Sequence, residues 1–156
     1  MIRVQQEDFD PAAEVERLVA GNRAIGGVVS FTGLVREMSD GRAIRAMTLE
    51  HYPGMTEKML REIEAEANRR WPLEASLIVH RYGRLAAGDR IVLVVVASAH
   101  RQAAFEACAF LVDWLKTRAP FWKLEETDAG AEWVEARASD DAAAGRWLAA
   151  DTKAAE

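Results

Sequence analysis

Two lysines near the end of a predicted helix have surroundings suited to proton transfer. Lys116 lies in the last turn of that helix, and Lys123 follows the aromatic pair Phe121–Trp122. Aromatic side chains beside a lysine exclude water, which lowers the pKa of the amine and makes it usable as an acid, base or nucleophile near neutral pH. A structural interpretation competes with this one, because helix C-termini attract cations and aromatic side chains usually serve packing.

Four further side chains have the types that bind a phosphate or a carboxylate. His100 and Arg101 stand between a predicted strand and a predicted helix, where free backbone N–H groups attract anions. Arg36 follows a buried strand in a glycine-containing loop, and Arg118 lies close to the first lysine. The structural alternatives are that Ser98 caps the helix while His100 and Arg101 are only solvated, and that Arg36 merely solvates its loop. If all these cations converge, they form an anion site with lysine chemistry beside it.

The cysteine and histidine content excludes several kinds of site. Cys108 is the single cysteine, which excludes an internal disulfide, a Cys-rich zinc site and a two-cysteine redox motif. It lies on the apolar stripe of a predicted helix, so we expect a buried, inert thiol that is no sulfur source. The three histidines lack metal-ligand spacing, so we expect neither metal nor cofactor, and we interpret His51 and His80 as structural.

Charge and hydropathy narrow the possible partners. The chain has 156 residues, half of them apolar, and a net charge of -5, which argues against general nucleic-acid binding. The longest apolar run, Ile91–Ala97, is far shorter than the ~20 residues of a membrane helix. The first residues resemble a strand and lack the features of a signal peptide. We therefore expect a cytoplasmic protein that binds neither membranes nor nucleic acid.

Apolar periodicity and the positions of proline and glycine predict the elements that carry these residues. Helices are expected after the Asp10–Pro11 cap, from a Thr56 cap to Pro72, and over 100–117. Strands are expected at the N-terminus and over 26–32, 44–52, 77–82 and 91–98, with a polar loop over 33–42 and a hairpin of 123–127 with 132–136.

This mixture of strands and helices predicts an α+β fold with a mostly antiparallel or mixed sheet. One domain is expected over residues 1–138. The remaining residues, 139–156, form an alanine-rich, charged tail that we expect to be helical around residues 146–148 and then to fray.

Several motifs, in the same order, resemble those of the MoaE family, the large subunits of molybdopterin synthase. The likeness runs from about residue 26 to about residue 148, and each motif is weak alone while the set is specific. The motifs that carry it are GVVSFTGLVR (27–36), LEHYPGMTEK (49–58), HRYG (80–83), GD (88–89), ASAHR (97–101) with AFEA (104–107), LKTRAPFWK (115–123) and WV (133–134).

The resemblance implies a fold, a reaction and partners. The fold is an α/β hammerhead with an additional antiparallel β-subdomain. Two large subunits form a central homodimer, and a small ubiquitin-like sulfur-carrier subunit docks at each end to complete a heterotetramer. The thiocarboxylate on the carrier's C-terminal Gly-Gly tail supplies sulfur for the conversion of cyclic pyranopterin monophosphate into molybdopterin, the dithiolene ligand of the molybdenum cofactor.

The family's functional residues carry over to positions that match in type. Its two active-site lysines fall on Lys116 and Lys123, and its anion-binding residues fall on Arg36, His100 and Arg101. Lys116 is then the general acid and base beside the carrier's tail. Lys123 would position the substrate or stabilise negative charge, and Arg118 is a candidate for holding the partner's carboxylate end.

Two other hypotheses about the function are compatible with the sequence. A non-catalytic phosphate- or partner-binding module would tolerate arginine in place of the lysines. A lyase that forms a Schiff base through Lys116 would need no protein partner, and borohydride would trap its adduct with a carbonyl substrate.

Overall fold

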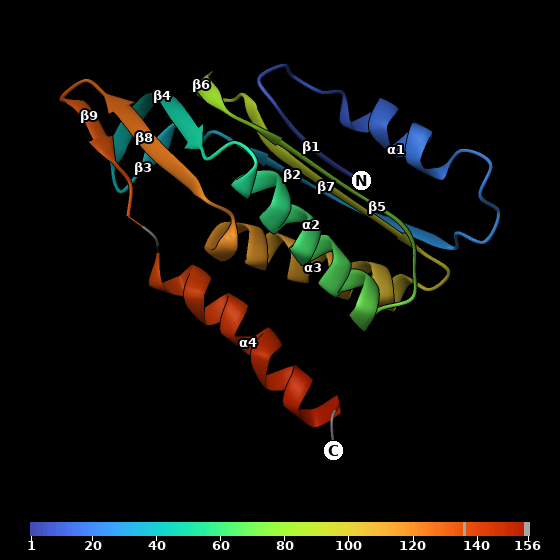
Figure 1. Ribbon diagram of the computed structural model, residues 1–156. Coiled ribbons are helices and arrows are strands. Elements are labelled where there is room, and N and C mark those ends of the chain that lie inside the picture. Colours follow the sequence, from blue (N-terminus) through green and yellow to red (C-terminus); the bar gives the residue numbers. More distant parts are fainter. Residues whose placement is uncertain (136, 155–156) are drawn as a thin grey trace.

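Two β-sheets form the frame of the molecule in the computed structural model, which describes residues 1–135 and 137–154 (Figure 1). The first is a mixed sheet in which β1 runs parallel to β5 and the other neighbours are antiparallel. Its strand order is β1 (Ile2–Gln5), β5 (Leu73–Arg81), β7 (Arg90–Ser98) and β2 (Gly27–Leu34).

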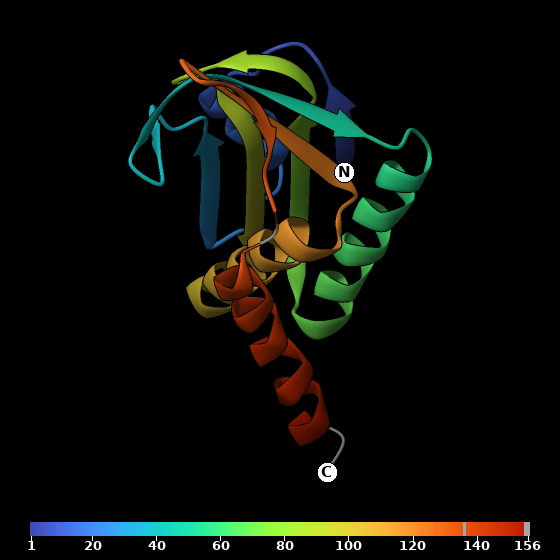
Figure 2. The ribbon, with the colours of Figure 1, turned by 90° about the vertical axis from the view of Figure 1, so that its left-hand side faces the viewer.

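The second sheet is antiparallel and lies at one end of the first (Figures 1 and 2). Its strands are β3 (Met38–Ser39), β4 (Arg42–His51), β8 (Phe121–Thr127) and β9 (Gly130–Trp133), and β6 (Gly83–Ala86) also pairs with β4. A mixed sheet with an added antiparallel sheet confirms the predicted α+β class.

Helices cover both faces of the mixed sheet. Helix α1 (Pro11–Val19) packs on one face, and α2 (Met55–Arg70) and α3 (Arg101–Arg118) pack on the other (Figure 1). Helix α4 (Ala138–Ala154) packs across α3 and extends away from the sheets (Figure 2). No helix among residues 1–135 and 137–154 is long and apolar enough to cross a membrane.

The main core lies between the mixed sheet and α2 and α3. Phe110 and Leu111 of α3 are fully buried against Ile78 and Val94 of the sheet. Burial of one such large apolar side chain contributes about 1.5–3 kcal/mol. Helix α3 is therefore held firmly, and its two ends have defined places in the molecule.

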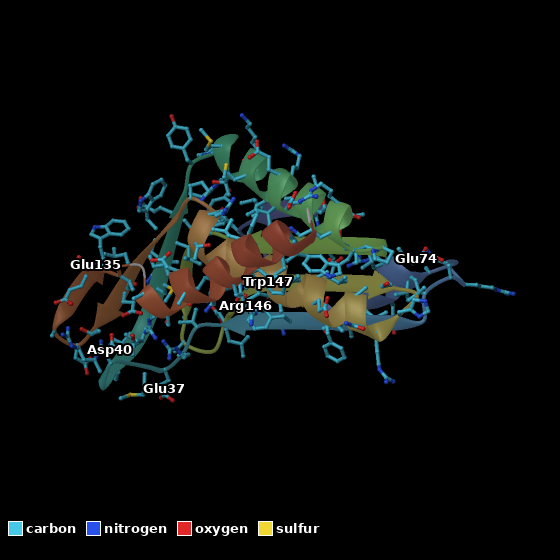
Figure 3. The ribbon with its side chains drawn as sticks, turned by 90° about the horizontal axis from the view of Figure 1, so that it is seen from below. Glu37, Asp40, Glu74, Glu135, Arg146 and Trp147 are labelled. Atoms are coloured by element: carbon cyan, nitrogen blue, oxygen red, sulfur yellow. The ribbon has the colours of Figure 1, made fainter. Side chains whose placement is uncertain are left out.

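Trp147 is the largest side chain of α4 that packs against this core. Trp147 packs edge-on against Trp71 and Phe110, and its indole N–H donates to Asp113 Oδ2 at 2.7 Å. The neighbouring Arg146 also reaches Asp113, and both side chains lie where α4 crosses α3 (Figure 3). The helix is longer than the sequence predicts around residues 146–148.

Most predicted elements are present, but the expected Thr56 cap is wrong, and so is the competing interpretation in which Ser98 caps α3. Gly54 precedes α2, and its N–H donates to Glu57 at 2.6 Å, whereas Thr56 bonds the backbone of Tyr52. Ser98 does not cap α3, because His100 occupies the cap position and the Ser98 hydroxyl donates to the carbonyl oxygen of Pro72, between α2 and β5.

Two short strands, β3 and β6, were not predicted, and β5 begins four residues earlier than expected. Strand β3 pairs with β4 through the turn Asp40–Gly41, in which both residues have positive φ. Asp-Gly suits such a turn, since aspartate tolerates and glycine favours this conformation.

The start of β2 lies unusually close to the start of α3. A Cβ atom on Gly26 would stand 2.1 Å from the carbonyl oxygen of Ala99, and one on Gly27 would stand 3.5 Å from Cα of Arg101. Glycine is therefore required at position 26. This approach places the first turn of α3 at the beginning of β2.

Candidate functional site

A cavity of about 850 Å³ opens between the two sheets and the C-terminal end of α3. Strands β2, β4, β7 and β8, the end of α3 and the segment after β9 all line it. Four cationic side chains face it, and they come from widely separated parts of the chain: Arg36, Lys116, Lys123 and Arg137. Three carboxylates also line it, those of Glu125, Glu135 and Asp140, so the cations outnumber the anions by one, which suits a ligand that carries negative charge.

The two lysines reach this cavity from successive elements. Pro120 cannot continue a helix, and Ala119 before it is already extended, so the chain leaves α3 and enters β8 within a few residues. Lys116 lies in the last turn of α3, and Lys123 lies in β8 opposite Leu49 of β4. The turn at Pro120 thus brings both amines to the same cavity.

The surroundings of Lys123 shift the pKa of its amine. Burial lowers its pKa, and the positive charge of Lys116 lowers it further. Arg137 acts in the same direction, while the carboxylates of Asp140 and Glu125 oppose it. A lysine whose pKa is lowered in this way can release and take up a proton closer to neutral pH.

Arg36 lies in the loop after β2, and backbone hydrogen bonds of the preceding residue, Val35, hold that loop in place. The buried Val35 donates its N–H to the carbonyl oxygen of Asp89 at 2.9 Å and accepts from the N–H of Gly88 at 2.8 Å. These bonds fix the loop on the turn before β7. The Arg36 side chain is exposed and reaches the cavity beside Leu34.

His100 and Arg101 do not reach the cavity of their own chain. Both are exposed at the start of α3, and neither lines the cavity. Helix α3 has 18 residues, which separates its ends by about 27 Å. Lys116 is at the other end of the same helix, so one chain does not bring these three residues together.

Arg118 is also outside the cavity. Its guanidinium lies 3.7 Å from the centroid of the Trp114 ring, which is a close cation–π contact. The structure therefore gives Arg118 a packing partner on α3.

Phe121 and Trp122 are part of the cavity wall. Phe121 is half-buried and stacks on His80 with ring centroids 3.7 Å apart, while the Trp122 side chain is 51% exposed. The pocket-wall interpretation of this pair is therefore confirmed over simple core packing. Cys108, by contrast, is buried in the main core, and burial raises the pKa of its thiol to about 11. That agrees with the expected inert thiol.

Sequence reasoning missed several polar residues of the cavity, among them Arg137, Glu125 and His80. Arg137 and Glu125 line it beside Lys123, and His80 had been interpreted as structural. Arg137 follows β9 in a charged segment that contains no recognisable motif. The β8–β9 hairpin returns this segment to the cavity, and Figure 3 shows its position through the labelled Glu135. A histidine in a predicted strand was the one available signal for His80.

The chain is similar to known proteins in both sequence and structure. The family model described as "MoaE protein" matches residues 4–118. A protein of Pseudomonas aeruginosa named molybdopterin synthase catalytic subunit is 61% identical over 146 residues, which cover 94% of this chain and 97% of that protein.

Two solved structures resemble the fold closely. A molybdopterin biosynthesis MoaE protein from Burkholderia ambifaria superposes with a TM-score of 0.81 at 53% identity, covering 94% of this chain and 97% of that one. A molybdopterin synthase from Staphylococcus aureus superposes with a TM-score of 0.79 at 34% identity, covering 85% of this chain and 96% of that one.

Proposed function

The chain belongs to the MoaE protein family, and on this premise we propose that it is the catalytic subunit of a molybdopterin synthase. The reaction is the transfer of sulfur from the C-terminal thiocarboxylate of a small ubiquitin-like carrier to cyclic pyranopterin monophosphate. The observation that carries this proposal is the pair Lys116 and Lys123, which share one cation-rich cavity and of which Lys123 has a lowered pKa.

The chemistry requires the kind of group that the cavity contains. The thiocarboxylate sulfur forms a C–S bond to a carbon of the pterin side chain while a C–O bond at that carbon breaks, and water then cleaves the acyl–sulfur bond. Sulfur stays on the pterin and the carrier is left with an ordinary carboxylate. Proton transfer accompanies both steps, and a positioned lysine amine can supply it. The buried thiol of Cys108 offers no alternative sulfur source, because it lies in the core and its pKa is raised.

We assign the general acid–base role to Lys116, which is exposed at the end of α3 where a protein tail can enter. Lys123 is half-buried and positions the substrate or stabilises the negative charge that develops on it. Arg36 pairs with the substrate phosphate, since a guanidinium binds phosphate through two parallel hydrogen bonds.

His100 and Arg101 are suited to the same substrate when a second copy of the chain supplies them. Strand β2 is at the edge of the mixed sheet, and its apolar residues Val28, Phe31 and Leu34 are exposed. An unpaired edge strand of this kind is a natural site for pairing with another copy.

Antiparallel pairing of two β2 strands would set the Gly27 end of one beside the Leu34 end of the other. Gly27 lies against Arg101, and Leu34 lines the cavity. The pairing would therefore carry Arg101 of one copy toward the cavity of its partner. A homodimer whose sites are shared accounts for these two cations where a single chain does not.

Reconstitution tests the proposed function. The wild-type protein, cyclic pyranopterin monophosphate and a thiocarboxylated ubiquitin-like partner are mixed and assayed for molybdopterin. Lys116→Ala should abolish turnover while the protein complex still assembles, and Lys116→Arg should also lose most activity. Product formation at the wild-type rate by the arginine variant would favour a binding role over acid–base chemistry, and the absence of product with wild-type protein would contradict the proposal.

Mixed dimers test the shared site. Chains carrying Arg101→Ala are combined with chains carrying Lys116→Ala, each inactive alone. In a shared arrangement every heterodimer keeps one intact site, so random mixing should restore roughly a quarter of the wild-type turnover. No recovery in demonstrated heterodimers would show that Arg101 does not act across the interface.

A further inference from the structure

His80 is a polar side chain in a place where polar side chains need partners. It lies in β5 opposite Val92 of β7 and Val4 of β1, and only 8% of it is exposed. It is nevertheless one of the residues that line the cavity of the two lysines. The ring nitrogens of a buried imidazole in that position need hydrogen-bond partners, either from the protein or from a ligand.

Two contacts hold the imidazole ring in one orientation. The Phe121 ring stacks on it at 3.7 Å between centroids, with an interplanar angle of 15°. The Nδ1 atom lies 2.8 Å from the carbonyl oxygen of Arg81. A carbonyl oxygen only accepts hydrogen bonds, so Nδ1 carries the proton and Nε2 presents a lone pair.

The ring stays neutral at physiological pH. Burial lowers the pKa of His80 to about 4, which the bond to the Arg81 carbonyl opposes in part and the nearby Lys123 and His51 reinforce. Within the described part of the chain no donor is recorded on Nε2. A neutral, fixed and nearly buried acceptor therefore remains unused in the wall of the cavity.

We propose that His80 is a substrate-binding residue whose Nε2 accepts a hydrogen bond from an N–H group of the pterin ring system. The inference rests on the proposed function, because that function supplies the ligand. A buried acceptor discriminates strongly, since a ligand without the matching donor leaves the acceptor unpaired. In this arrangement His80 recognises the ring system of the substrate, while the surrounding cations bind its phosphate.

A pair of substitutions separates the two nitrogen atoms. In His80→Asn the amide N–H can replace Nδ1 as donor to the Arg81 carbonyl, but nothing replaces Nε2. In His80→Gln the longer side chain can place an acceptor oxygen near the position of Nε2 and gives up the bond at Nδ1. The matched control is His51→Asn, because His51 bonds Thr56 and does not line the cavity.

The measurement is the affinity for cyclic pyranopterin monophosphate, by calorimetry, with the large subunit alone so that no turnover occurs. Loss of one hydrogen bond should weaken binding by about tenfold in His80→Asn. His80→Gln and His51→Asn should stay close to wild type, and thermal melting checks that each variant is folded. Equal affinity of His80→Asn and wild type, or a loss confined to His80→Gln, would overturn the proposal.

A second measurement needs no substitution. Wild-type protein is titrated with pterin monophosphates methylated in turn at each ring N–H. One methylated form should bind at least about tenfold more weakly, whereas unchanged affinity across the set would overturn the role of His80. If wild-type protein does not bind the unmodified pterin at all, the proposed function itself fails, and that result is distinct from a failure of His80 alone.

Discussion

Acidification from pH 7 to pH 4 is expected to destabilise this fold through His80. Burial keeps the pKa of the folded-state imidazole at about 4, whereas an exposed histidine has a pKa of about 6.5. Between these values the unfolded chain binds a proton that the folded chain does not. The free energy of unfolding is therefore highest above pH 6.5 and falls as the pH drops through this window.

The size of the effect follows from the two pKa values. Linkage between protonation and folding predicts a loss of about 2 kcal/mol at pH 5 and about 3 kcal/mol at pH 4, relative to neutral pH. That is a large part of the roughly 5–15 kcal/mol that stabilises a typical domain.

Urea unfolding of the wild type and of His80→Phe at pH 7, 6, 5 and 4 isolates this contribution. Phenylalanine keeps a flat ring against Phe121 and cannot titrate. Asp8 and Glu66 are held at pKa values of about 2, mainly by hydrogen bonds from arginines, and they titrate alike in both proteins, so they cancel. The stability difference between the two proteins should shift by about 3 kcal/mol in favour of the variant by pH 4. Parallel pH curves would refute the reasoning.

Two further substitutions test packing around the site. Arg118→Ala removes the guanidinium stacked on Trp114, so the free energy of unfolding should fall by about 0.5–1 kcal/mol; a large loss of turnover at unchanged stability would instead indicate substrate contact. Gly26→Ala drives a methyl group into the carbonyl of Ala99 and should cost at least about 2 kcal/mol, measured by urea unfolding. The control Gly145→Ala, in open space on α4, should be neutral or stabilising, and a similar loss in both variants would contradict the proposed clash.

The elements that the sequence predicted well are those with strong local signals. The β-branched run of β7, the Asp10–Pro11 start of α1 and the stop at Pro120 all depend on neighbours in the chain, and all are present as predicted. Strands β3 and β6 have only two and four residues and show no clear alternation. They are strands because β4 lies beside them, which is a property of the folded chain.

The candidate site likewise has features that the sequence predicts and features that only the folded chain shows. Lys116 and Lys123 stand out in the sequence because an aromatic pair and a proline lie between them, and the structure brings both to one cavity. The distance between Arg101 and Lys116 was also implied by the sequence, since a predicted helix over 100–117 already separates these two residues by about 22 Å. Only the exposed edge of β2 shows how a second copy would close that gap.

The sequence by itself determined the class of the fold, the family and the cationic types at the site, because periodicity, turn residues and motifs are local properties. Tertiary structure alone decided what those groups can do. Lys123 has a lowered pKa and His80 a neutral ring because strands distant in sequence bury them together, and desolvation depends on all neighbours in space. For the same reason the sequence did not predict that Arg137 lines the cavity. Nor did it predict that Arg118 lies outside the cavity and stacks on the ring of Trp114.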